Sequence, residues 1–79
     1  MVDEALEHLV RGIVAHPQDV SVVERNRKRG PVLEVRVHPD DLGKVIGRAG
    51  RTATALRTVI AGLGGRGIRV DFLDVDEGR

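Results

Sequence analysis

The stretch "GKVIGRAGRT", residues 43–52, combines three glycines with three basic side chains in ten positions. Gly47 and Gly50 lack a Cβ, so the backbone between them can turn sharply and a second backbone can approach closely. A helix that starts after Gly50 would present free amides at its N-terminus, and such amides bind phosphate oxygens well. Arg48 and Arg51 add positive charge at the same place. The segment is therefore a candidate phosphodiester site, although the same spacing would also serve a simple turn between two packed helices.

The charges are segregated along the chain, although they nearly cancel to a formal net charge of +1. Residues 42–70 contain six basic side chains and no acid, and a second basic run, "RNRKR", covers residues 25–29. The acids gather near the two ends, as Asp3, Glu4, Glu7, Asp71, Asp74, Asp76 and Glu77. A basic middle is the pattern that a polyanion binder needs on one face. The "RNRKR" run would be either a second electrostatic contact or a solvated hairpin tip.

The first half of the chain predicts one helix and one hairpin. Apolar side chains recur at steps of three and four over residues 1–15, with acids on the remaining arc, which indicates an amphipathic helix. Residues 19–38 are predicted to form two antiparallel strands joined by a basic turn. The second strand alternates apolar and polar residues, so one face should be buried and the other exposed to solvent. The apolar set is Leu33, Val35 and Val37, and the polar set is Glu34, Arg36 and His38.

The second half predicts a helix–loop–helix segment over residues 39–63, with the Gly47–Gly50 loop between its helices. Pro39 and the acids after it mark the start, and the glycine-rich "GLGGRG" marks the end. The second of these helices buries a stripe of Ala53, Leu56, Ile60 and Leu63. A last strand covers residues 66–74, and residues 75–79 are a frayed tail.

The resulting order is α β β α α β in one domain, residues 1–79. Strands joined by a short turn pair antiparallel, whereas the helical crossover lets the second and third strands pair in parallel. We expect an α+β fold, with a three-stranded mixed sheet and three helices packed on one face. The other face of the sheet stays open to solvent or to a partner.

Catalysis finds no support in these residues. Three histidines are scattered, and Asp40 and Asp41 are neighbours at a helix start, where they favour the helix dipole instead of facing each other across a cleft. No nucleophile motif or metal-ligand spacing is present. The letters G-x-G-x-x-G in "GLGGRG" follow a helix and precede a strand, the reverse of a dinucleotide site. We expect no enzyme, no metal and no cofactor.

Composition and the start of the chain bear on location. There is no cysteine, and no apolar run approaches the roughly 20 residues of a membrane span. The N-terminus carries acids where a signal peptide needs a positive start. We expect a cytoplasmic protein that does not enter a membrane.

The segment "GKVIGRAGRTATAL", together with the α β β α α β order, resembles the KH domain family in its type II, prokaryotic arrangement. The resemblance is strongest to small bacterial proteins that consist of one KH domain, and it covers nearly the whole chain. It implies that the chain binds single-stranded RNA, with Gly47, Arg48, Ala49 and Gly50 as the clamp on the RNA backbone. The full set of implied site residues is Gly43, Lys44, Val45, Ile46, Gly47, Arg48, Ala49, Gly50 and Arg51.

The resemblance also implies what the residues beside the clamp do. Gly43 would leave space for the RNA strand, Val45 and Ile46 would form groove wall and core, and Lys44 and Arg51 would add phosphate contacts. Ala53 stands where many KH domains have isoleucine, which implies a shallower groove and looser base selection. Phe72, the one aromatic residue, is expected to face the core, so it would not stack on bases.

Finally, the resemblance implies a wider role. It suggests an RNA chaperone or post-transcriptional regulator connected with cell shape, cell-wall biogenesis and division. It also suggests a larger KH protein of the Jag (KhpB) type as partner, and a homodimer. The alternative is a small protein–protein interaction module that dimerises through its open sheet face or first helix, with an incidental basic surface.

Overall fold

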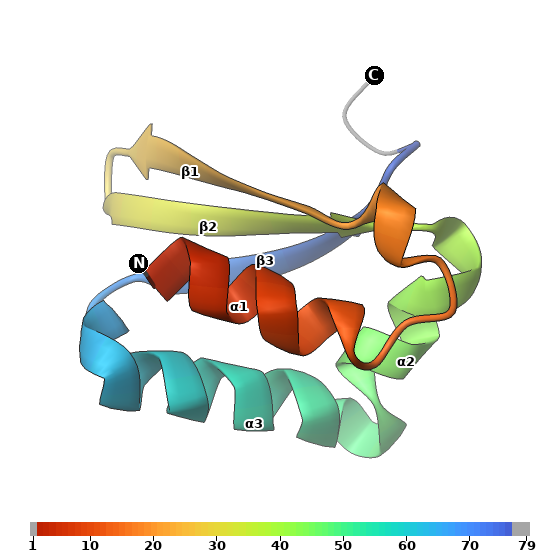
Figure 1. The fold of residues 1–79 in the computed structure, drawn as a ribbon. Coiled ribbons are helices and arrows are strands. Elements are labelled where there is room, and N and C mark those ends of the chain that lie inside the picture. The colour runs from red at the N-terminus through yellow and green to blue at the C-terminus, as the bar shows by residue number, and fades with distance from the viewer. Residues whose placement is uncertain (1, 77–79) are drawn as a thin grey trace.

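A computed structural model describes residues 2–76 of the chain as two layers, a sheet and a layer of helices (Figure 1). The strands are β1 (Ser21–Arg27), β2 (Gly30–Val37) and β3 (Arg69–Asp74), and the α-helices are α1 (Val2–Arg11), α2 (Leu42–Ile46) and α3 (Arg51–Ile60). β2 is central, antiparallel to β1 and parallel to β3. Figure 1 shows the three helices together on one side of the sheet. The predicted α+β class, element order and mixed sheet are confirmed.

The core lies between the sheet and the helices and is aliphatic. Alternate residues of β2 point into it, as expected, because successive side chains of a strand face opposite ways. Phe72 packs against this core while remaining partly exposed. The fully enclosed members include Leu6 and Val10 of α1, Leu33, Val35 and Val37 of β2, Val45 of α2 and Ile60 of α3.

The first helix is shorter than its periodicity predicts, because it ends at Arg11 and not near Ala15. Gly12, a poor helix former, donates its N–H to the carbonyls of both His8 and Leu9. Three and four residues further on, the backbone amides of Ala15 and His16 donate to the buried carboxylate of Asp41, at 3.1 and 2.9 Å. Residues 12–14 still bond back to α1, and from Ala15 on a contact across 26 positions of sequence takes the place of helical hydrogen bonds.

The buried stripe of α3 stops before the residue predicted to complete it. Ala53, Leu56 and Ile60 are buried, but Leu63 is 55% exposed. After Ile60 the chain enters a π-helical turn, Ala61–Gly65, in which the wider backbone changes the direction of each later side chain. The prediction that Leu63 is buried is therefore wrong.

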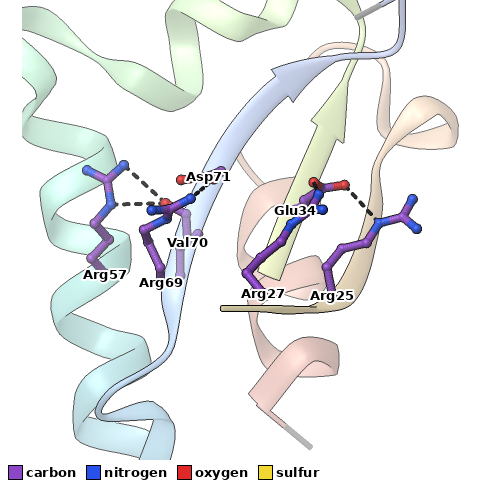
Figure 2. Close-up of polar contacts among 7 residues, drawn as sticks. All are labelled: Arg25, Arg27, Glu34, Arg57, Arg69, Val70 and Asp71. Carbon is purple, nitrogen blue, oxygen red and sulfur yellow. Dashed lines mark hydrogen bonds and ion pairs between the residues drawn. The ribbon is translucent and has the colours of Figure 1, made fainter. Parts of the chain in front are cut away.

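The hairpin turn is tighter than the basic run suggested, since β1 continues to Arg27 and only Lys28 and Arg29 form the turn. Glu34 was expected to be wet, yet the residue is only 8% exposed. Arg25 and Arg27 from β1 fold over its carboxylate, as Figure 2 shows. The polar face of β2 is thus partly covered by side chains of the neighbouring strand.

The end of the chain bears on one further prediction. The sequence predicts a frayed tail over residues 75–79, but its first residue is held, because the N–H of Val75 donates to the carbonyl of Val37 at 2.8 Å. Residues 77–79 lie outside the described residues.

Within residues 2–76, no helix has both the length and the apolar character needed to cross a bilayer.

Candidate nucleic-acid interface

The residues 43–51 that the sequence singles out form one continuous feature: α2, the Gly47–Gly50 loop and the first residue of α3. Gly47 has φ 77° and ψ 170°, and Gly50 has φ 74° and ψ 14°. Ala49 lies between them at φ 56°, the one non-glycine residue with positive φ in the described part of the chain. Three of the four loop residues therefore have backbone conformations that side chains disfavour, which makes the elbow sharp.

Gly47 is required by space as well as by conformation. A Cβ built on it would overlap the hydroxyl of Thr52 and lie 2.8 Å from the Thr52 backbone nitrogen. A Cβ at Gly50 or at Gly43 would meet nothing within 4 Å. The backbone of the loop thus packs directly on the start of α3 at Gly47, whereas the surface over Gly43 is open.

The loop and its flanks are also positively charged and accessible. Arg48, Ala49 and Arg51 are exposed, and no carboxylate within residues 2–76 lies at ion-pair distance from either arginine. The Nζ of Lys44, one turn before the loop, lies 3.5 Å from Oδ1 of Asp41. The charge at the elbow is therefore uncompensated at its tip and only partly balanced at its base.

The apolar pair before the loop is split between core and surface. Val45 has no accessible surface and belongs to the core, while Ile46 is half-buried. Ala53, in the first turn of the following helix, is buried as well. Of the pair, only Ile46 offers apolar surface beside the loop.

Sequence reasoning missed the residue that anchors α2. Asp41, assigned to the helix dipole, is fully buried and accepts hydrogen bonds from the amides of Ala15 and His16 and from Nδ1 of His16 at 3.0 Å. Burial alone would raise its pKa, but these bonds and the nearby imidazole outweigh burial and lower the pKa to about 2. Asp41 therefore stays ionised and ties the start of α2 to the loop that follows α1.

The same region brings two histidines together, which no sequence spacing indicated. The rings of His16 and His38 stack at 3.9 Å between centroids and 14° between planes, and nitrogen and carboxylate atoms of these two and Asp40 lie within 4.8 Å of one another. The Nδ1 of His16 is bonded to Asp41, and the Nδ1 of His38 accepts from the amide of Asp40. Nearly parallel rings do not aim their remaining nitrogens at one point, so the cluster does not have the convergent geometry of a metal site.

The far end of α3 is tied to β3, the edge strand on this side of the sheet. Nε and Nη2 of Arg57 donate to the carbonyl of Val70 at 3.3 and 3.2 Å, as Figure 2 shows. The same guanidinium lies 5.4 Å from the ring centroid of Phe72. Arg57 thereby links α3 to β3 and lies over the ring of Phe72.

Known proteins resemble this chain along almost its whole length. A family model described as "KhpA/KhpB, KH domain" matches residues 3–71. RNA-binding protein KhpA of Streptomyces coelicolor is 71% identical over 79 residues, with both chains fully covered. RNA-binding protein KhpA of Mycobacterium tuberculosis is 66% identical over 77 residues, 98% of this chain and 96% of its own. RNA-binding protein KhpA of Halalkalibacterium halodurans is 46% identical over 72 residues, 87% of this chain and 95% of its own.

Proposed function

This chain belongs to the KhpA/KhpB family of KH domains, and from that premise we propose that it binds single-stranded RNA without catalysis. The relatives carry the name of an RNA-binding protein and not that of an enzyme. The observation that carries the proposal is the elbow itself. At residue 47 the backbone has a conformation and a close packing that only glycine permits. Beside it lie Arg48 and Arg51, which have no carboxylate partner among residues 2–76.

In the proposed mode, the loop holds the RNA backbone. The amides of Arg48 and Ala49 at the exposed tip donate to phosphate oxygens, while the guanidiniums of Arg48 and Arg51 neutralise charge. The open surface over Gly43 lets the strand lie against α2, and Lys44 adds a further phosphate contact. Ile46 supplies the apolar wall, with Val45 packed beneath it as support.

Base selection in this mode is weak. Phe72 lies under Arg57 and packs on the core, so a flat aromatic platform for bases is not offered. Recognition would depend on aliphatic surface and on backbone groups of β3. Affinity would then depend mainly on phosphate contacts and fall as salt rises.

A charge-reversed loop tests the proposal. Asp tolerates the left-handed conformation that residue 49 adopts, so Arg48→Asp with Ala49→Asp should leave the fold intact. We expect binding of a labelled oligouridylate to weaken at least about tenfold, or about 1.4 kcal/mol. Arg11→Asp with Gln18→Asp makes the same change of charge at two exposed positions away from the loop and serves as control. Equal binding by both variants, with unchanged circular dichroism, would refute the clamp.

The wider role belongs to the same proposal. We propose a cytoplasmic RNA chaperone or post-transcriptional regulator, acting on cell shape and cell-wall biogenesis, that works with a KhpB-type partner. The inclusion of both proteins in one family model supports the pairing. Co-purification with a tagged KhpB-type protein from the same organism, with and without ribonuclease, tests it.

Self-association has one observation in its favour. Val59 and Leu63, on the outer side of α3 and just beyond it, are 44% and 55% exposed. A homodimer that buries these side chains would be stabilised by the hydrophobic effect. Sedimentation of the wild type and of a Val59→Ser, Leu63→Ser variant tests this second role, since a dimer would become monomeric.

A further inference from the structure

We propose that the face of the sheet opposite the helices is a second binding site for RNA phosphates, which extends the path of a strand held by the Gly47–Gly50 loop. The inference rests on the proposed function. Its basis is a row of arginines on this face, Arg69 of β3 and Arg25 and Arg27 of β1, with Arg57 of α3 beside the row at the edge of β3 (Figure 2).

The strand register places the row. Arg25 of β1 is opposite Val32 of β2, and Val32 is in turn opposite Arg69 of β3. Residues opposite one another in a sheet point to the same side, away from the core set Leu33, Val35 and Val37. Arg57 lies beyond β3 and bonds to its backbone at Val70. Figure 2 shows Arg57, Arg69, Arg27 and Arg25 following one another across α3, β3 and β1.

Val32 lies between Arg25 and Arg69 in the register and is only 3% exposed, although no helix within residues 2–76 packs on that side. Their own side chains stay accessible: 63% for Arg69, 54% for Arg27 and 47% for Arg25. Long aliphatic stems lying on apolar surface with heads in water account for both observations. The guanidinium groups therefore form the outer surface of the sheet.

Glu34 holds the neighbouring arginine side chains in place, and the charge that remains on this face is positive. Its carboxylate accepts from Nε of Arg25 at 3.2 Å and from Nη2 of Arg27 at 3.0 Å, and it lies 3.7 Å from Nη2 of Arg36. Asp71 is opposite Glu34 on the same face and pairs with Arg69, so four arginines meet two carboxylates there and the face has a net charge of +2. A guanidinium has five N–H donors, and each of these contacts uses few of them. Because these arginine side chains are already held in place, they lose little conformational entropy when their remaining N–H groups bind a phosphate.

The row lies within reach of the loop. Arg57 follows Gly50 by seven helical positions, which is about 10 Å along α3. An RNA segment clamped at the loop and running along α3 meets Arg57 first, then Arg69 at the sheet edge, and then Arg25 and Arg27. Only a strand longer than the roughly four nucleotides held by a KH loop can reach all of these arginines.

The experiment measures how salt affects the binding of two oligouridylates, one of about five nucleotides and one of about twelve, because the shorter fits within the loop and the longer extends past it. The first variant is Arg69→Gln. In the wild type, Arg69 forms a surface ion pair with Asp71 at 3.2 Å. The second combines Arg25→Gln, Arg27→Gln and Glu34→Gln, so that no carboxylate is left without its partners. Arg11→Gln is the control, since its surface ion pair to Glu7 lies on α1.

We expect the slope of log K against log salt for the longer RNA to become shallower by about 0.7 for each phosphate that the variant no longer binds. For the triple variant the expected change is about 1.4, or about 25-fold in affinity for each tenfold change in salt. The shorter RNA should bind all variants equally. The sheet site would be overturned if the sheet variants gave the same slope for the longer RNA as the Arg11→Gln control. It would also be overturned if these variants bound RNA normally and lost only the binding of a KhpB-type protein.

Failure of the two proposals can be told apart. If the charge-reversed loop still binds the short RNA, the clamp is wrong whatever the sheet variants do. If the loop variant loses the short RNA while the sheet variants keep the full slope for the long one, only the sheet site is wrong.

Discussion

Gly47 and Gly50 bracket the same loop, yet alanine should be far more harmful at the first position than at the second. Both residues have positive φ, 77° and 74°. At Gly50 the added methyl group would meet nothing within 4 Å, so the cost is that of a left-handed side chain, about 1–2 kcal/mol.

At Gly47 two costs combine. Its ψ of 170° puts it in a region that glycine alone populates, which costs about 1–3 kcal/mol for another residue. The methyl group would also lie 2.8 Å from the backbone nitrogen of Thr52, which no side-chain rotation can move away. Overpacking of this kind adds about 1–3 kcal/mol, so the total is about 2–6 kcal/mol. A domain of 79 residues has a free energy of unfolding of about 4–12 kcal/mol, so Gly47→Ala should be marginally folded.

Thermal unfolding followed by circular dichroism measures the difference. Each kcal/mol lowers the midpoint by about 4–8 °C in a domain of this size, so Gly47→Ala should unfold at least several degrees below Gly50→Ala. Ala49→Gly is the matched control. Relief of strain at φ 56° is offset by the greater freedom of glycine in the unfolded chain, so its midpoint should change little. Equal midpoints for the two alanine variants would show that contact with Thr52 is unimportant and that the reasoning is wrong.

Three other outcomes follow from the structure. The pKa of Asp41 is lowered to about 2 from an ordinary 3.8, so its contribution to stability is complete above about pH 4 and disappears as the pH falls through about 2. Midpoints of wild type and Asp41→Asn should therefore differ at pH 7 and converge in acid, and parallel curves would contradict this account. Arg57→Met keeps the stem but removes both bonds to Val70, and it should lower the midpoint by about 4–8 °C, as expected for about 1 kcal/mol. Gly43→Ala should raise the midpoint, since helical alanine is favoured by about 0.5–1 kcal/mol, yet weaken RNA binding at the now crowded surface; unweakened binding would exclude RNA from that part of α2.

Local patterns were enough to predict the elements that hold the candidate site. The alternation in β2, the stripe on α3 up to Ile60 and the glycine spacing at 47–50 each depend on neighbours within one turn or one strand. The conformation of the loop was predictable for the same reason, because few residues other than glycine adopt positive φ. The short turn and the helical crossover then left few topologies to consider.

What could not be predicted depends on residues far apart in the sequence. Nothing near Asp41 indicates that it binds amides 25 and 26 positions earlier, so both its burial and the early end of α1 were missed. The burial of Glu34 likewise depends on the register that brings Arg25 and Arg27 over it. Leu63 became exposed because the helix widened after Ile60, a change that its periodicity does not encode.

The position of β3 in the chain has a consequence for protein synthesis. This strand supplies the parallel partner of central β2 and the carbonyl that holds Arg57, yet it follows every other described helix and strand. During translation the hairpin and both helices of the loop emerge first, with part of their apolar surface uncovered. A nascent chain acquires the geometry proposed for RNA only after residues 69–74 have been made. A polypeptide truncated before residue 69 would therefore not compete with the finished protein for transcripts.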